Sequence, residues 1–227
     1  ETLRNMKLIS IETSGPVCSV ALSYGDNVVG ELSNSDGNRH DELCAEYVRC
    51  LLKENNLKVT DLDAIAVSSG PGSFTGLRIG ASIAKALCFR ENDEDYAPKL
   101  IAVPTLSAFA NAVTEMRVGF SKIIAVIPAQ RDYLYYQIFL NRYPELIEMS
   151  DVSLFRIEEF KLFDFKDTFI CGPKQEVFKE MVAPPYLINY SAQLIAKVAI
   201  KKYKAGEFTD AKDYKPMYVQ DFQVKTK

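Results

Sequence analysis

The sequence is poor in the residues from which many active sites are built. Its 227 residues include a single histidine, His40, and five cysteines, none of them in a Cys-x-x-Cys spacing. One histidine cannot supply the paired imidazoles of a metallopeptidase helix, and an odd number of scattered cysteines favours reduced thiols over disulfides or a zinc site. We therefore expect no metal site and no catalytic residue in this chain.

Long apolar runs and a strong charge of either sign are also missing. No run approaches the roughly 18 apolar residues that cross a bilayer, and the first residues lack the basic and apolar regions of a signal peptide. The net charge of −3 provides no field that would attract a phosphate backbone. We expect a cytoplasmic protein without membrane association, whose contact with nucleic acid depends on another chain.

What the sequence does contain is a regular succession of strand and helix patterns. Apolar runs separated by glycine-containing turns predict three strands, followed by an amphipathic helix, a buried strand and a second helix. A bridging strand at 100–103 and a helix opened by Pro104 and Thr105 lead into a weaker copy of the same order. The first copy comprises strands 7–13, 17–22 and 28–32, helix 41–55, strand 64–68 and a helix ending near 89. The second comprises strands 123–127, 133–140 and 145–154, helix 157–163, strand 168–171 and helix 175–182.

A repeated βββαβα order is typical of the actin-like ATPase architecture (ASKHA, ribonuclease H-like), an α/β fold in which two halves face each other. We expect a first half at 6–104 and a second, degenerate half at 105–227, which ends in a helix at 191–204 and an extended tail from 214. Fold alone does not establish function.

A glycine-rich turn joins the buried strand to the second helix. Gly70, Gly72 and Gly76 let the backbone approach a ligand closely, and free amides at a helix N-terminus attract anions, so Gly70, Gly72, Ser73 and Gly76 form a candidate phosphate cradle. In the alternative, Ser73 or Thr75 caps the helix and the glycines permit a tight turn. The spacing excludes a P-loop and a dinucleotide fingerprint.

The helix after this turn is apolar nearly all round and must be covered on more than one side. One interpretation is a core helix. The other is that this helix and the helix at 41–55 together present an apolar surface to a second subunit. The expected contact residues are Tyr47, Val48, Leu51, Ile79, Gly80, Ile83 and Ala84.

The stretch from Ser69 to Gly80 resembles the signature of the TsaB (YeaZ) family of bacterial tRNA threonylcarbamoyladenosine biosynthesis proteins, which are glycoprotease-like relatives of TsaD. Segments 9–22, 39–40, 103–106 and 216–222 agree with that family in the same order, so the resemblance covers nearly the whole chain.

The resemblance implies a non-catalytic, dimerising subunit. Such a subunit pairs with a TsaD-like catalytic subunit and a TsaE-like ATPase, and the complex transfers threonylcarbamoyl to adenosine 37 of tRNA. It also implies a homodimer when the chain is alone, contact with tRNA only through the complex, and no tightly bound cofactor, with ATP or ADP and Mg²⁺ bound at the level of the complex.

Two departures from the family bear on a nucleotide site. Glu12 stands where the family usually has an aspartate, and it either helps to organise Mg²⁺ or closes a hairpin. Pro128-Ala129-Gln130 replaces a common Asp-Ala-Arg run, which removes two charges. Two other functions stay open: an autonomous actin-like ATPase or small-molecule kinase using Glu12 and the loop at 70–76, and a glycoprotease-like metallopeptidase.

Overall fold

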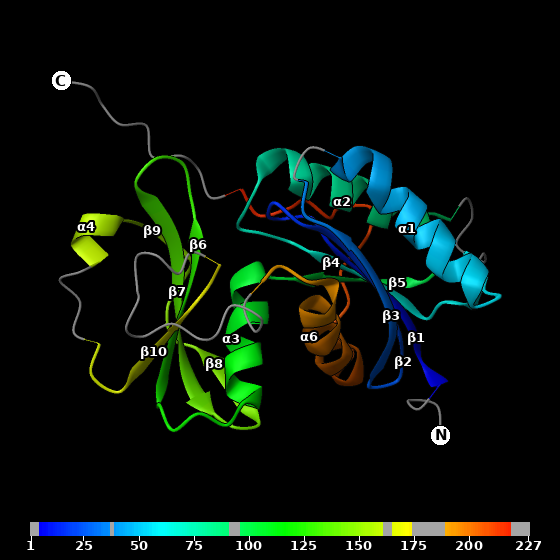
Figure 1. Cartoon of the computed structure of the whole chain (residues 1–227). Coiled ribbons are helices and arrows are strands. Elements are labelled where there is room, and N and C mark those ends of the chain that lie inside the picture. The colour runs from blue at the N-terminus through cyan, green and yellow to red at the C-terminus, as the bar shows by residue number, and fades with distance from the viewer. Residues whose placement is uncertain (1–4, 37–38, 91–95, 161–164, 174–188, 219–227) are drawn as a thin grey trace.

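Two mixed β-sheets, each with its own helices, make up the computed structural model (Figure 1), which describes residues 5–36, 39–90, 96–160, 165–173 and 189–218. The first sheet has the order β3-β2-β1-β4-β5, with β1, β2 and β3 antiparallel and β4 and β5 parallel to β1. Its strands are β1 (Lys7–Glu12), β2 (Cys18–Tyr24), β3 (Asn27–Asn34), β4 (Ala64–Ser68) and β5 (Lys99–Val103).

The second sheet repeats part of this order among the described residues, with β10, β6 and β7 in the places of β4, β1 and β2. β6 pairs with β7 in antiparallel fashion and with β10 in parallel fashion, and β7 in turn pairs with β8 and β9. Its strands are β6 (Lys122–Pro128), β7 (Tyr133–Arg142), β8 (Glu145–Glu148), β9 (Ser153–Arg156) and β10 (Thr168–Cys171). The expected actin-like arrangement of two related halves is confirmed.

The described helices and a 3₁₀ turn lie between these strands or, in the case of α6, after the last of them. They are α1 (His40–Glu54), η2 (Val59–Asp61), α2 (Phe74–Leu87), α3 (Thr105–Glu115), α4 (Ile157–Phe160) and α6 (Ala192–Ala205). The helix expected at 175–182 lies outside the described residues. Among those residues, no helix combines the length and apolar character that a membrane crossing requires.

One strand prediction was wrong, because residues 145–154 form two short strands rather than one. Both strands pair with β7, at opposite ends of it. The chain bends between them at Ser150, whose hydroxyl accepts a hydrogen bond from the Ile138 amide and whose carbonyl accepts one from Gln137. These contacts between distant residues fix the bend.

Alternation of side chains divides the core of the first half between the two faces of its sheet. Ile9 and Ile11 of β1 pack with buried residues of α1 and α2, whereas Leu8 faces the other way and packs with α6. α3 and α6 lie side by side between the two sheets (Figure 1), and Lys201 of α6 donates to Asn111 of α3 at 2.6 Å. The two halves therefore share a helical layer.

α6 packs mainly against the first sheet, although its residues lie in the expected second half at 105–227. Small residues on both sides, among them Ala66 on β4 and Ala199 on α6, let helix and sheet approach closely. Glu31 of β3 holds the start of α6, since its carboxylate accepts hydrogen bonds from Ser191, Gln193 and the Ala192 amide. The first half therefore includes a helix from the end of the sequence.

Candidate functional site

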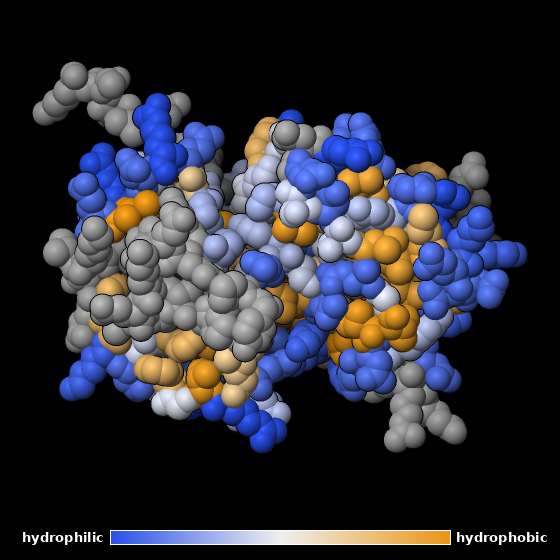
Figure 2. All heavy atoms as spheres, viewed as in Figure 1, coloured by the Kyte–Doolittle hydropathy of each residue, from blue (hydrophilic) through white to orange (hydrophobic). Residues whose placement is uncertain are grey.

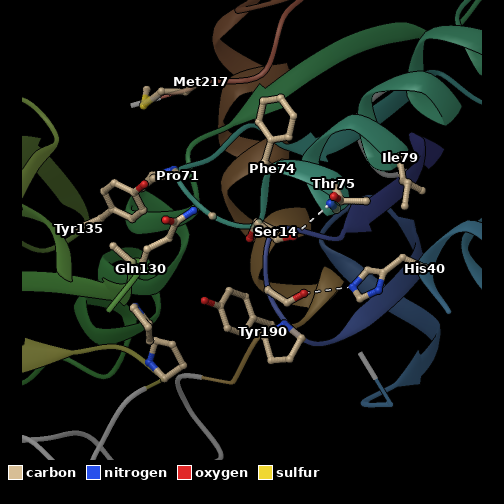
Figure 3. A pocket seen from close by; sticks show the side chains of 18 of the residues that line it. Ser14, His40, Pro71, Phe74, Thr75, Ile79, Gln130, Tyr135, Tyr190 and Met217 are labelled. Carbon is tan, nitrogen blue, oxygen red and sulfur yellow. Dashed lines mark hydrogen bonds between the residues drawn. The ribbon is translucent and has the colours of Figure 1, made fainter. Parts of the chain in front are cut away.

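A cleft of about 1050 Å³ opens between the two halves (Figure 3). Turns at the ends of strands form most of its wall. They are residues 14–16 between β1 and β2, 71–73 between β4 and α2 together with 74–76 in the first turn of α2, 128–130 at the end of β6, and Pro173 after β10. The start of α1, Ile79, Tyr135, Tyr190 before α6, and the tail residues Met217 and Tyr218 complete it.

The glycines of the glycine-rich turn are required by contacts inside the protein. A Cβ atom on Gly72 would overlap the carbonyl oxygen of Ser14, and one on Gly76 would overlap the carbonyl oxygen of Thr13. At Gly70, the φ angle is +105°, and the carbonyl oxygen of Met217 would lie 2.8 Å from an added Cβ. The turn therefore holds the β1–β2 turn, α2 and the C-terminal tail against one another, which accounts for these glycines without a phosphate.

Ser73 caps α2, as one of the two interpretations predicts. Its hydroxyl accepts a hydrogen bond from the Gly76 amide at 3.2 Å, and its own amide donates to Ser14 at 2.7 Å. The next two amides, of Phe74 and Thr75, form no hydrogen bond with the described residues. Gly72, Ser73 and Gly76 line the cleft, whereas Gly70 lies behind the wall.

Glu12 closes the β1–β2 turn. Its carboxylate accepts hydrogen bonds from both the amide and the hydroxyl of Ser14, each at 2.6 Å. Burial raises the pKa of Glu12 to about 7, and the two Ser14 hydrogen bonds oppose that shift. Because Glu12 is buried behind Ser14 and does not line the cleft, the hairpin-closing interpretation describes its contacts.

His40, the first residue of α1, is also used within the protein. Its Nε2 atom donates to the carbonyl oxygen of Gly15 at 3.0 Å, as the dashed line in Figure 3 shows, and the side chain is buried. The histidine thereby ties α1 to the β1–β2 turn.

The second half contributes the opposite wall. The Ala129 amide donates to Tyr133 within the β6–β7 turn, and the Gln130 side chain extends into the space between the halves (Figure 3). Gln130 is exposed. It presents a neutral amide to the cleft.

Four of the seven expected contact residues are not available to a partner. Val48, Leu51 and Ala84 are buried in the core of the first half, and Gly80 packs against Thr13 and Val67. The side chains expected at the contact from Val48, Leu51, Gly80 and Ala84 face inward instead, because the apolar face of α1 and the row of small residues on α2 both pack into the core of the first half.

The other three, Tyr47, Ile79 and Ile83, are only partly buried and form part of the outer surface of α1 and α2. Figure 2 shows apolar side chains among hydrophilic ones on the first half, beside α1.

Sequence patterns did not predict that Tyr190, Met217 and Tyr218 line the cleft. Tyr190 precedes the predicted last helix, and Met217 and Tyr218 belong to a tail without a periodic pattern. The Met217 amide donates to Ser69 at 2.7 Å, and the Tyr218 ring lies 4.9 Å from that of Phe74. No local signal predicts that the tail returns to the glycine-rich turn.

Comparison with known families identifies the chain. The family model described as "TsaD: tRNA N6-adenosine threonylcarbamoyltransferase" matches residues 28–154, which is more than half of the sequence. The chain belongs to the TsaD family.

Within the TsaD family, the chain is similar to proteins named tRNA threonylcarbamoyladenosine biosynthesis protein TsaB. It is 32% identical to the Haemophilus influenzae protein over 59% of this chain and 54% of that protein. It is 30% identical to the Escherichia coli protein over 58% of this chain and 54% of that protein. The matches span about half the length of these curated relatives.

Solved structures show the same fold over almost the whole chain. YeaZ from Pseudomonas aeruginosa superposes with a TM-score of 0.78 and 24% identity, covering 94% of this chain and 100% of that one. A second Pseudomonas aeruginosa structure is titled as an uncharacterised protein with similarity to the peptidase YeaZ. It superposes with a TM-score of 0.79 and 23% identity, covering 95% of this chain and 100% of that one. The expected resemblance of this TsaD-family chain to TsaB and YeaZ is confirmed.

Proposed function

We propose that this chain is a non-catalytic, dimerising subunit of the machinery that transfers threonylcarbamoyl to adenosine 37 of tRNA. Its partners in this proposal are a TsaD-like catalytic subunit and a TsaE-like ATPase. The similarity to TsaB proteins carries the proposal, because both named relatives are described as tRNA threonylcarbamoyladenosine biosynthesis proteins. The single histidine supports it, since His40 is buried against Gly15.

The outer face of α1 and α2 is the proposed contact surface. Tyr47, Ile79 and Ile83 are apolar or aromatic residues that the core of the chain leaves partly uncovered. A stable interface buries about 1,600 Å² in total, so further residues of both helices take part. We propose that the isolated chain forms a homodimer through the same face. In this proposal tRNA is reached only through the complex, and ATP or ADP with Mg²⁺ binds at the level of the complex.

Co-elution with a TsaD-like protein tests this proposal. The substitution Ile83→Asp places a charge in the proposed contact and should weaken association at least tenfold while the circular dichroism spectrum stays unchanged. Ser82→Asp, an exposed neighbour on the same helix, is the matched control and should leave association intact. Val48→Asp instead buries a charge in the core and should unfold the chain.

The proposal fails if the wild-type chain does not co-elute with its partner in the presence of a TsaE-like protein and nucleotide. It also fails if Ser82→Asp and Ile83→Asp weaken association equally.

An autonomous actin-like ATPase or small-molecule kinase is the second candidate, and the large cleft between the halves favours it. Mg²⁺-dependent turnover of ATP by the isolated chain would support this candidate. Glu12→Gln should abolish that turnover only if the carboxylate serves a metal ion. A glycoprotease-like metallopeptidase requires stoichiometric zinc or iron in the purified chain, which elemental analysis measures directly.

A further inference from the structure

Two cysteines that are far apart in the sequence meet beneath the start of α1. Cys18 is the first residue of β2 and Cys44 lies in α1, and both belong to the core cluster of the first half. Their side chains are hydrogen-bonded to each other, and the two residues are only 2% and 0% exposed. All five cysteines lie in described segments, and each is a free thiol. The two sulfur atoms are therefore in contact without a covalent bond.

The hydrogen bond of His40 explains why these thiols meet. Its Nε2 atom donates to the Gly15 carbonyl (Figure 3), which fixes the first turn of α1 on the β1–β2 turn. Cys44 follows His40 by one helical turn on the buried face of α1, and Cys18 comes soon after Gly15 in the chain. Because a cysteine side chain is short, the contact requires the backbones of α1 and β2 to lie close together here. Closely spaced backbones are the geometric requirement for a disulfide.

The surroundings of the pair favour a disulfide over a metal site. Zinc in a structural site takes four ligands. Within the described segments, no group of three or more histidine, cysteine, aspartate or glutamate side chains is placed to hold a metal ion. The other cysteines lie elsewhere: Cys50 is hydrogen-bonded to Glu46, and burial raises the pKa of Cys88 and Cys171, at the ends of α2 and β10. Each of the two contacting thiols therefore has the other as its natural redox partner.

Within the pair, Cys18 is the thiol that ionises first. The Cys44 thiol donates to Cys18 and lowers the pKa of Cys18, although burial opposes this shift, and the same contact raises the pKa of Cys44. The thiolate is the reactive form of cysteine. Pro16, two residues before Cys18, and His40, one turn before Cys44, both line the cleft. The cleft is therefore the side from which a small oxidant approaches the pair, when the first turn of α1 opens locally.

We propose that Cys18 and Cys44 are a redox-modification site, which forms a reversible disulfide between β2 and α1 when the chain meets a peroxide. The Cys18 thiolate attacks one oxygen of hydrogen peroxide, the O–O bond breaks, and the other oxygen leaves as water with the proton that Cys18 gave up. The Cys44 sulfur then attacks the sulfenic acid on Cys18, the S–O bond breaks, and a second water leaves with the Cys44 proton. Two thiols are oxidised, and one peroxide is reduced to two waters.

The disulfide changes the stability of the chain and is reversed by a small dithiol through thiol–disulfide exchange. A covalent link between β2 and α1 removes conformations from the unfolded chain, so the oxidised protein should unfold at a higher temperature than the reduced one. This site goes beyond the partner role proposed above and does not depend on it, because it belongs to the isolated chain.

Treatment of the full chain with one equivalent of hydrogen peroxide tests the proposal, followed by thiol counting in denaturant and peptide mapping by mass spectrometry. The count should fall by two from the five thiols of the reduced chain, and a pair of peptides joined through Cys18 and Cys44 should appear. A small dithiol should restore all five thiols. The thermal midpoint should rise on oxidation and return on reduction.

Substitutions separate the roles of the two sulfur atoms. Cys18→Ala should slow the peroxide-dependent loss of the Cys44 thiol at least tenfold, and Cys44→Ala should leave a sulfenic acid on Cys18 that dimedone labels. Cys50→Ser changes a less buried position of the same helix and is the matched control, which should lose the same two thiols as the wild type. Circular dichroism checks that each variant is folded.

Three results on the wild type would overturn the proposal, so its test does not depend on whether the variants fold. They are free thiols at both Cys18 and Cys44 after the peroxide has been consumed, a disulfide from either residue to a different cysteine, or a link that a small dithiol does not reduce. The test is also independent of co-elution with a TsaD-like protein. A chain that forms the disulfide without forming a complex would contradict only the partner role, and a chain that forms the complex without the disulfide would contradict only the redox site.

Discussion

The two hairpin turns that face each other across the cleft occupy equivalent places in the two halves but differ in their surroundings. In the β1–β2 turn, Ser14 bonds to Glu12 and Ser73, and Gly15 bonds to His40. In the β6–β7 turn, Ala129 and Tyr133 form backbone hydrogen bonds within the turn, the Asp132 carbonyl accepts one from the Ile157 amide of α4, and the Gln130 side chain is exposed. The first turn is a structural joint between several segments, whereas the second can change its side chains without disturbing the core.

The loops after β4 and β10 show how far the two halves have remained alike. Gly70-Pro71 follows β4, and Gly172-Pro173 follows β10, and both prolines line the cleft. A Cβ atom on Gly172 would overlap the carbonyl oxygen of Val126, which is again a close approach of backbone to backbone. The repeat is therefore retained where the chain packs tightly and has diverged at the exposed hairpin.

The largest loss of stability should come from Gly76→Ala, at the point where the first turn of α2 packs against the β1–β2 turn. The new Cβ atom meets the Thr13 carbonyl, which belongs to the backbone and cannot move aside, so we expect a loss of about 3 kcal/mol or more. Gly119→Ala, at an exposed site of the second half with open space around the added atom, should stay within about 0.5 kcal/mol. Urea denaturation measures the free energy of unfolding of both variants. Similar losses for the two would contradict the difference between the tightly packed position of Gly76 and the open position of Gly119.

The next effect is a pH dependence of stability caused by Glu12. Its pKa of about 7 in the folded state lies above the ordinary value of 4.5 for a glutamate, so the folded state binds this proton more tightly than the unfolded chain. The stabilising contribution is fully present below about pH 4.5 and is lost as the pH rises to about 7, a change of roughly 3 kcal/mol. Glu12→Gln should remove this slope when unfolding is followed from pH 4.5 to 8.

The exposed Glu145→Gln in the second half should keep the slope of the wild type. Identical pH profiles for the wild type and Glu12→Gln would show that the buried carboxyl does not titrate in this range.

A smaller effect is expected where Glu31 holds the start of α6. Glu31→Gln weakens the acceptor for Ser191 and the Ala192 amide and should cost about 1–3 kcal/mol. In the second half, Ser150→Ala removes a neutral hydrogen bond to the Ile138 amide and should cost about 1 kcal/mol. Thermal unfolding compares the two, and a larger loss for Ser150→Ala would contradict the greater importance of the α6 contact.

The smallest effect concerns the aromatic contact at the rim of the cleft. Phe74 and Tyr218 are each about half exposed, with Arg78 lying 3.9 Å from the Phe74 ring centroid. A double-mutant cycle of Phe74→Leu and Tyr218→Leu should give a coupling of about 0.5–1 kcal/mol. A coupling near zero would show that the tail does not rest on α2 in solution.

Local sequence patterns were sufficient for most strands and helices of the first half, because its apolar residues alternate or recur at helical spacing. β4 and α2 are examples, since both have a strongly apolar sequence bounded by turn residues. The second half was harder to predict because the break between β8 and β9 depends on the contact of Ser150 with Ile138, and no spacing within the segment encodes that contact.

The cleft itself could be predicted only in part. The glycine-rich turn was visible in the sequence, but the reason for Gly72 and Gly76 lies in Ser14 and Thr13, which are distant along the chain. Tyr190 carries no motif at all, and only the return of α6 to the first sheet brings its ring against Gly15. Contacts between distant segments decide which residues meet, and local periodicity does not contain them.

The return of α6 has a consequence for the order in which the protein can be made. One face of the first sheet stays uncovered until residues 192–205 have been synthesised, although the sheet's own strands end at residue 103. A ribosome-bound chain truncated before α6 would therefore expose Leu8, Ala66 and Val103, which are buried in the finished protein. The strands of the first half therefore leave the ribosome well before the helix that completes their core.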